Sequence, residues 1–242
     1  MNLHSRILES LRGGCVCIND HSNLGSLAVA VGKYLDIYGT LPPAYTVDEN
    51  GKPMHSWRAL LLPYLDDTKS ISYNYSEPWD SPHNQKFHDK MPTVFRCQCA
   101  ANISQHRYPS YVMIVGKNTI SDGTSCTRYE NIKGLNVIIF IEIRNANFNW
   151  LEPIDISFDA LDYNNIANNF QLPSIGSHHK SPKEFYVLTS GWNRHYLTLK
   201  TTSINTIKAM ATIDGARTVI EKKDAKTQMK YFEFQNDKSE KK

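Results

Sequence analysis

The 242-residue sequence predicts an α+β fold, in which an N-terminal amphipathic helix packs on a mostly antiparallel β-sheet with additional short helices. Helical periodicity marks the early part of the chain, and strand-like apolar runs follow residue 108. The two kinds of segment do not alternate as βαβ units would. With 40% hydrophobic and 21% charged residues, the composition is that of a globular protein long enough to bury a core.

The first expected element is a spine helix within residues 1–39. Apolar side chains recur at helical spacing over "SNLGSLAVAVGKYLDIYG", and a more polar helical piece, "SRILESL", precedes it. Gly39 suits the C-terminal end of this helix, and two prolines soon after it prevent continuation. One face carries an apolar stripe that could contact neighbouring subunits or cover the chain's own sheet. The stripe consists of Leu24, Leu27, Val31 and Leu35.

Residues 40–107 are expected to form a segment rich in turns and short helices. The stretch "DENG" predicts a turn, and Ser56 is the predicted N-cap of a helix that Pro63 shortens or kinks. A second short helix is predicted over "SPHNQKFHDKMP", with Ser81 as its cap. This segment should therefore supply turns and short helices.

From Tyr108 the periodicity changes, and residues 108–220 are expected to hold the sheet and a final helix. "SYVMIVG" and "NVIIFIEI" predict strands, the second apolar enough to be central. "FNWLEP" predicts a strand ending at Pro153, and "EFYVLTSGWNRHYLTLK" predicts two strands joined by a turn. The helix "SINTIKAMATI" completes a single domain spanning residues 1–220, and residues 221–242 form a charged tail.

The charge distribution argues against a nucleic-acid partner. The formal net charge is +3, and the tail, with seven Lys against five acids, holds +2 of it. No basic face interleaved with aromatic residues remains. No window approaches the ~18 apolar residues that cross a bilayer, so no membrane span is expected in this chain.

The five cysteines are arranged as two C-x-C pairs and one single residue, Cys126. Structural zinc sites usually place two to four residues between ligands, so this spacing disfavours zinc. Export would favour a disulfide of the Cys17-to-Cys97 type, and an intracellular location would favour buried free thiols. The odd number leaves at least one thiol unpaired within the chain.

Familiar catalytic motifs are missing, so we expect no enzymatic activity and no catalytic residue. The sequence has no Gly-rich phosphate loop, no His-Glu-x-x-His and no Gly-x-Ser-x-Gly. In "SEPWDSPHN", Glu77, Asp80 and Asn84 could offer oxygen ligands to calcium. The favoured interpretation is a turn in which Trp79 packs on the core and the carboxylates cap backbone amides. No other cofactor is expected.

A second acidic set lies around Trp150, which Glu142 and Glu152 flank. Paired carboxylates can perform acid–base chemistry, but nothing in the sequence supplies a substrate pocket. Salt bridges to Arg58 or Arg144 are the favoured interpretation. We expect tryptophans to anchor the core, although an exposed one would suit a sugar-binding platform. The three concerned are Trp57, Trp79 and Trp150.

Several of these segments together resemble a known family. "YGTLPPAYTVDENGKPMHSWRALLLPYLD", followed by "YNYSEPWDSPHNQKF" and "FRCQC", closely resembles a planctomycete family of pilin-like proteins. Members have been described both as relatives of type II secretion pseudopilins and as solute-binding proteins. "NLGSLAVAVGKYLDIYG" is similar to the family's spine helix. The family's strand ending in Glu and its Trp-x-Glu-Pro-x-Asp segment correspond to Glu142, Trp150, Glu152, Pro153 and Asp155.

The resemblance covers residues 5–220 and implies a pilin-like fold with a structural function. The expected function is that of a non-catalytic subunit or accessory of a type II secretion or pilus-like cell-envelope assembly, with other such subunits as partners. The alternative is a periplasmic or surface module that binds a small solute or glycan. The family's hallmark, a histidine followed after nine residues by Asp-Gly, is degenerate here. His179 is followed, one residue later than usual, by Ser190-Gly191.

The resemblance also bears on location. Typical members begin with a leader and a hydrophobic helix half, which this sequence does not show at its start. We expect the cell envelope, on its periplasmic face, if the natural chain has an N-terminal anchor. We expect the cytoplasm if Met1 is the natural start.

Overall fold

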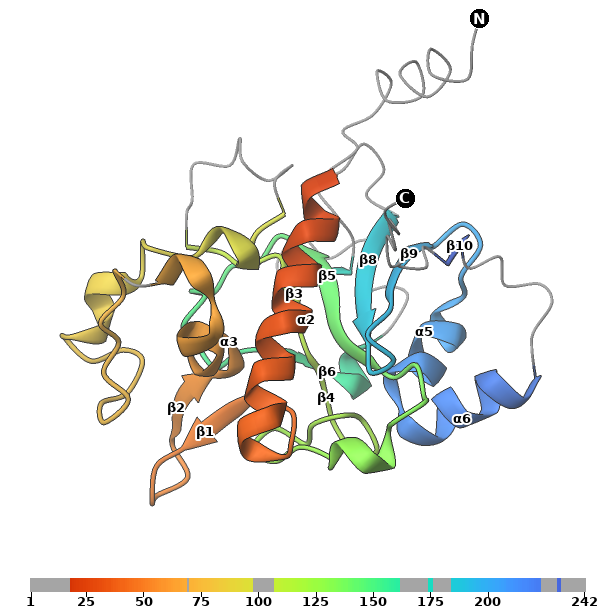
Figure 1. Ribbon diagram of the computed structural model, residues 1–242, viewed down its shortest axis with the longest axis horizontal. Helices are drawn as coiled ribbons and strands as arrows, with labels where there is room; N and C mark the ends of the chain where they lie inside the picture. Colours follow the sequence, from red (N-terminus) through yellow and green to blue (C-terminus); the bar gives the residue numbers. More distant parts are fainter. Residues whose placement is uncertain are drawn as a thin grey trace, which may run out of the picture.

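The computed structural model describes residues 18–68, 70–97, 107–161, 174–175, 184–222 and 230–231. A long helix lies across one face of an antiparallel sheet, and two shorter helices lie beside the sheet (Figure 1). The long helix packs into one of two hydrophobic clusters, and the first of the shorter helices packs into the other. The predicted mixture of a long helix, short helices and an antiparallel sheet is therefore confirmed at this level.

The main sheet has the strand order β10-β9-β8-β5-β3, and β7 also pairs with β5. All its pairs are antiparallel. β5 is central, as its apolar sequence predicts, and β8 and β9 form the predicted hairpin. The strands are β3 (Tyr111–Val112), β5 (Ile138–Arg144), β7 (Ser174–Ile175), β8 (Glu184–Thr189), β9 (Arg194–Thr198) and β10 (Lys230–Tyr231).

Two smaller pairs of strands lie outside this sheet. One is the antiparallel hairpin of β1 (Tyr45–Val47) and β2 (Pro53–Ser56), closed by the predicted "DENG" turn. The other is a parallel pair of β4 (Ile114–Val115) and β6 (Ile156–Ser157). The predicted strand over "SYVMIVG" is thus divided in two. The division lies at Met113, whose backbone N–H donates to Asp155 Oδ1 at 2.8 Å.

The long helix α2 (Ile18–Tyr38) ends where the sequence predicts. Gly39 has φ +71°, a left-handed conformation that glycine adopts without a Cβ clash, and its N–H donates to the Leu35 carbonyl. Of the two expected uses of the apolar stripe, the structure shows that it covers the chain's own sheet, with Leu35 half-buried at its end. Leu24, Leu27 and Val31 are fully buried in the chain's own core, because α2 lays this face on the sheet. These side chains are not available to a neighbouring subunit.

The remaining helices are short. α3 follows the hairpin, and Pro63 ends it by starting a 3-10 turn. Ser56 occupies the predicted N-cap position but makes no capping bond, because its hydroxyl donates to the Trp150 carbonyl. Two α-helices follow β9 and precede β10, and only the first of them is predicted. The helices are α3 (Trp57–Leu61), η1 (Leu62–Tyr64), η2 (Asp66–Thr68), η3 (Asn84–Phe87), η4 (Thr93–Phe95), η6 (Tyr129–Asn131), η7 (Phe158–Ala160), α5 (Ile204–Ala211) and α6 (Ile213–Lys222).

The predicted strand over "FNWLEP" is wrong, since these residues form a turn. The Asn149 N–H donates to Glu152 Oε2, and the Leu151 N–H donates to Asn149 Oδ1. Side-chain oxygens thus accept hydrogen bonds from the backbone N–H groups that, in a strand, would donate to a neighbouring strand. Among the described residues, no helix has the length and apolar character needed to span a membrane.

Candidate functional site

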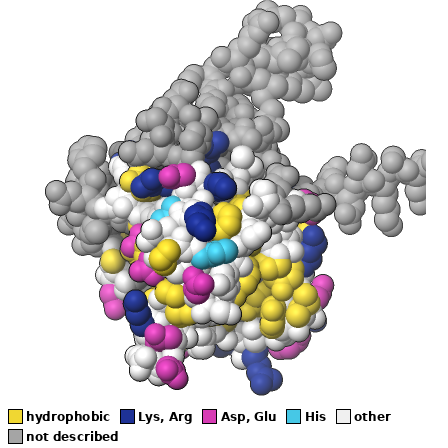
Figure 2. Space-filling model, turned by 90° about the vertical axis from the view of Figure 1, so that its left-hand side faces the viewer, with side chains coloured by type: hydrophobic (Ala, Val, Ile, Leu, Met, Phe, Trp, Pro, Cys, Tyr) yellow, Lys and Arg dark blue, Asp and Glu magenta, His cyan; other side chains and the backbone are white. Residues whose placement is uncertain are grey.

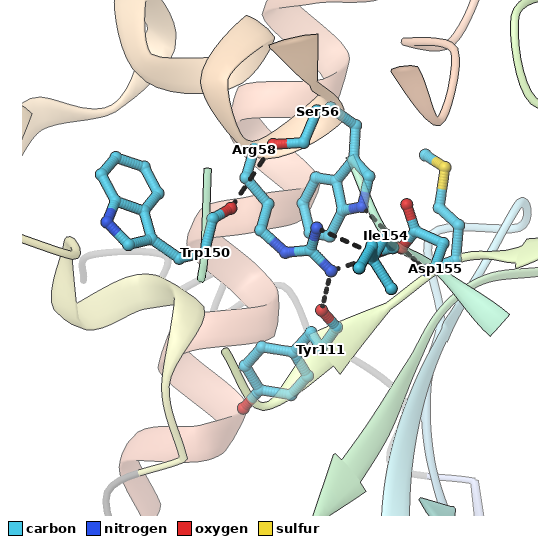
Figure 3. Close-up of polar contacts among 8 residues, drawn as sticks. Ser56, Arg58, Tyr111, Trp150, Ile154 and Asp155 are labelled. Carbon is cyan, nitrogen blue, oxygen red and sulfur yellow. Dashed lines mark hydrogen bonds and ion pairs between the residues drawn. The ribbon is translucent and has the colours of Figure 1, made fainter. Parts of the chain in front are cut away.

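The residues singled out around Trp57 and Trp150 meet in a buried cluster (Figure 3). Arg58, on α3, points its guanidinium toward Asp155: Nη2 lies 3.3 Å from Oδ1 and donates to the Tyr111 carbonyl at 2.8 Å. Nη1 donates to the Ile154 carbonyl at 3.4 Å. Trp57 adds a bond from its indole N–H to the same Asp155 Oδ1, at 3.1 Å. α3 is thereby tied to a loop 97 positions later in the sequence.

This cluster is closed to solvent. The Arg58 and Asp155 side chains are 0% and 2% exposed. Burial raises the pKa of Asp155, opposed by the Arg58 guanidinium and by three hydrogen bonds, and it lowers the pKa of Arg58. The guanidinium also lies 4.5 Å from the centroid of the Trp57 ring. A buried pair whose bonds run to backbone carbonyls and an indole is a structural clamp rather than an open site.

The acidic partner of Arg58 differs from the prediction. Arg58 pairs with Asp155, so the predicted salt bridge of Glu142 or Glu152 to Arg58 is wrong, whereas the alternative partner, Arg144, stays a prediction. Glu152 instead accepts from the Asn149 N–H in the turn after β5. Glu142 is fully buried on β5, and its Oε2 accepts from the Tyr186 N–H of β8. Both carboxylates hold backbone in place.

The "SEPWDSPHN" patch is organised by Asn84, which is fully buried. Its amide nitrogen donates to the carbonyls of Asn74, Glu77 and Pro78, and its Oδ1 accepts from the Asn74 N–H. The Glu77 carboxylate accepts from the Asn74 side chain. Trp79 is half-buried and stacks on a neighbouring histidine. In the part of the chain that the structure describes, no group of three or more His, Cys, Asp or Glu side chains is placed to hold a metal ion.

An open groove runs beside α2. It has a volume of about 760 Å³ and lies between the helix, η1, η4 and the start of β9. Arg194, at the start of β9, packs closely on the helix at Gly25, where a Cβ would lie 3.1 Å from its guanidinium. Partial burial lowers the pKa of Arg194. The lining includes the polar side chains of Asn23, Ser26, Lys33, Asp66, Thr93 and Arg194. We call this hollow the α2 groove.

A smaller hollow of about 550 Å³ lies on the other side of Val29. It is lined by α2 and by the β8–β9 turn, including Trp192, whose φ is +61°. The Trp192 indole N–H donates to the Tyr129 hydroxyl at 2.7 Å, which fixes the ring. Val29 itself is 58% exposed and lines both hollows. Both hollows therefore lie along the outer side of α2.

Four tyrosines form a row at the C-terminal end of α2, which we call the tyrosine ledge: Tyr34, Tyr38, Tyr64 and Tyr75. Tyr34 lies 4.3 Å from Tyr38 and 5.9 Å from Tyr64, measured between ring centroids. Burial and the neighbouring Tyr38 hydroxyl raise the pKa of Tyr64 to about 12. Burial, followed by Tyr64 and Tyr38, raises the pKa of Tyr75. The Tyr34 ring thus contacts both Tyr38 and Tyr64, and the Tyr75 hydroxyl lies near enough to Tyr64 and Tyr38 for their charge to affect its pKa.

The ledge is part of the molecular surface. Tyr38 is 57% exposed and Tyr75 is 41% exposed. Figure 2 shows that hydrophobic side chains gather in one area of the face that carries β1, β2 and the loops after α3. Because Tyr64 also lines the α2 groove, the ledge and the groove share a wall.

Comparison with known proteins found a family whose model matches part of the chain. A family model described as "Protein of unknown function (DUF1559)", with the short name SBP_bac_10, matches residues 18–136. The chain is thus similar to this family over just under half its length, which agrees with the predicted resemblance at that level. Neither the curated proteins nor the solved structures include a match to the sequence.

The matched segment contains one side of the buried clamp and most of the groove. Arg58 and Asn84 lie within it, whereas Asp155 and Arg194 lie beyond it. Cys97 is buried, and its predicted partner Cys17 lies outside the described residues, so their pairing stays a prediction. His179 also lies outside the described residues.

Sequence reasoning missed the tyrosine ledge. Its members come from three segments: α2, η1 and the loop that follows η2. The signal that could have indicated it is the spacing of four between Tyr34 and Tyr38, which places both rings on one helix face.

Proposed function

We propose that this chain is a non-catalytic binding module whose α2 groove takes a small polar solute. The observation that carries the proposal is the groove itself. Its volume of about 760 Å³ lies within the range typical of small-molecule sites. Its lining combines apolar surface from Val29 and Tyr64 with amide, hydroxyl and charged groups, which is the usual composition of such sites. The short name of the matched family, SBP_bac_10, fits solute binding.

The side chains around the groove favour binding over catalysis. Its charged pair, Lys33 and Asp66, lies at the surface with 4.0 Å between Nζ and Oδ1, an environment that leaves both groups well hydrated. The buried histidine His55 is used structurally. Its ring nitrogens contact the Tyr73 hydroxyl and the Tyr75 carbonyl. These arrangements support a module that holds a ligand without transforming it.

The test is a thermal-shift screen of the full chain against sugars, amino acids, nucleotides and small carboxylates. We expect at least one solute to raise the melting temperature, because a ligand bound only to the folded state stabilises it. Val29→Trp should fill the groove and abolish that shift. Glu49→Trp, in the exposed β1–β2 turn, is the matched control and should retain it. A screen without any shift, or a shift that survives in Val29→Trp, would refute the proposal.

A second candidate function is a subunit of a pilin-like cell-envelope assembly. The observation that favours it is the outer face of α2, where Ile37 is 63% exposed beside the exposed Val29 and Tyr38. Such apolar surface suits a protein contact. Assembly would then use this face rather than the buried Leu24 stripe. Sedimentation of the wild type and Ile37→Asp over a concentration range tests it, since only the wild type should self-associate.

A further inference from the structure

We infer that the α2 groove and the tyrosine ledge form one site for a neutral oligosaccharide, with hydroxyl groups of one sugar unit in the groove and the ring faces of the next on the ledge. The inference rests on the proposed binding function and names its ligand class. Three features carry it: the balance of polar groups in the groove, the exposed rings of the ledge, and the shared residue that joins them.

The polar groups of the groove match a ligand that both donates and accepts hydrogen bonds. Lys33 supplies donors, Asp66 supplies acceptors, and Ser26 and Thr93 bring hydroxyls that do either. Asn23 is partly committed, because its amide nitrogen donates to the Arg96 carbonyl at 2.8 Å. The charged side chains of the lining are the two cations Lys33 and Arg194 and the carboxylate Asp66, which lies 4.0 Å from Lys33. A cationic ligand would face both cations, and an anionic ligand would face Asp66. Neutral sugar hydroxyls accept from the cations and donate to Asp66 without meeting a like charge.

One ring of the ledge, that of Tyr75, is already held in place. The Tyr75 hydroxyl donates to the Ala59 carbonyl at 2.9 Å, and the Tyr75 carbonyl lies 3.0 Å from His55 Nε2. Since a carbonyl only accepts, His55 carries a proton on Nε2. The Tyr75 ring also meets Tyr73 edge-on, with 4.9 Å between centroids. A ring fixed at its hydroxyl and its backbone loses little conformational freedom when a ligand binds.

The two parts are joined at Tyr64. Its ring meets Tyr34 of the ledge nearly at right angles, at 83°. Its backbone carbonyl accepts from Lys33 Nζ at 3.3 Å, which holds the lysine at the edge of the groove. A chain of sugars that leaves the groove at this edge passes directly onto the ledge.

The chemistry favours a saccharide over a proline-rich peptide, another ligand of exposed aromatic surfaces. Proline residues lack the backbone N–H, so such a peptide offers mainly acceptors and leaves Asp66 without a donor. A pyranose ring has an apolar face for Tyr38 and a rim of hydroxyls for the groove. Tyrosine, with an apolar body and a polar tip, suits that combination.

The experiment is a glycan array probed with the full chain, followed by calorimetric titration of the best neutral oligosaccharide. Tyr38→Ala should weaken binding by about fivefold or more, because it removes a stacking face. Tyr38→Phe keeps the ring and should bind nearly as the wild type does. Val47→Ala removes a similarly exposed apolar side chain from β1 and is the matched control, with unchanged affinity expected.

The possible outcomes separate the two proposals. If no glycan binds while another solute still gives a shift that Val29→Trp abolishes, the saccharide class is wrong and the binding function stands. If a glycan binds but Tyr38→Ala has no effect, the ledge is not part of the site and the inference is overturned. If no glycan binds but a polyproline peptide does, and Tyr38→Ala weakens the peptide, the ledge recognises a peptide and the inference is overturned.

Discussion

Lowering the pH from 7 to 5 is expected to destabilise the fold by about 2 kcal/mol through His195 alone. This histidine lies on β9, opposite Val187 of β8, and is 1% exposed. Its Nε2 lies 3.4 Å from the Thr189 hydroxyl. Burial lowers the pKa of His195 from 6.5 to about 4, because the charged imidazolium would lose its hydration in the core.

The sign follows from proton binding. In the unfolded chain the pKa is that of an ordinary histidine, so between pH 6.5 and pH 4 the unfolded state binds more protons than the folded state. Stability is therefore full above about pH 6.5 and falls as the pH approaches 4. At about 1.4 kcal/mol for each pKa unit, the largest loss is about 3 kcal/mol, and about 2 kcal/mol of it is reached at pH 5.

The assay is urea unfolding at a series of pH values from 7 to 4.5, comparing the wild type with His195→Leu. The variant cannot titrate at this position, so its free energy of unfolding should fall by about 2 kcal/mol less between pH 7 and pH 5. Val187→Ala is the control, since it weakens packing on the same strand pair but keeps the histidine and hence the full pH dependence. Equal pH dependence in the wild type and His195→Leu would refute the reasoning.

Three further predictions concern the core. Arg58→Met should lower the free energy of unfolding, measured in urea, by about 3–5 kcal/mol, because it leaves Asp155 charged and buried. Adding Asp155→Leu should recover most of that free energy. A double variant without recovery would contradict the clamp. Leu27→Asp should abolish cooperative thermal unfolding, since it buries a charge under α2; a folded monomer would show that the helix face is not core. Asn84→Ala should lower the free energy of unfolding by about 2–3 kcal/mol, because it removes the hydrogen bonds that close the turn. An unchanged midpoint of urea unfolding would contradict this prediction.

Much of the fold could be predicted because its signals are local. The apolar spacing of α2 and the glycine at its end lie within one stretch, and so do the apolar run of β5 and the turn between β8 and β9. The errors have a common cause. Met113 and the turn at Asn149 leave the strand pattern because side-chain oxygens take their backbone N–H groups. Such competition depends on residues that the periodicity of a single segment does not show.

The candidate site was harder to predict for the same reason. The sequence marks the tryptophans and carboxylates, which the structure places in closed clusters. The open surface is built from Tyr64 and Tyr75, whose contacts with α2 arise only after the chain has folded. The acidic partner of Arg58 lies 97 positions away, and three carboxylates compete for that role in the sequence. Only tertiary contacts decide that Asp155 takes it.

These contacts also show why the matched segment depends on the rest of the chain. Trp57 stacks on Phe140 of β5, with 4.1 Å between ring centroids and 21° between ring planes. Phe140 lies beyond residue 136, where the matched segment ends, so the segment packs on later residues. α2 covers β8 and β9, which both follow that segment. The α2 groove therefore has one wall from the family-matched part, at Tyr64, and another from Arg194 outside it. The later strands thus place Arg194 against the helix at Gly25 and complete a groove that the family-matched part does not form alone.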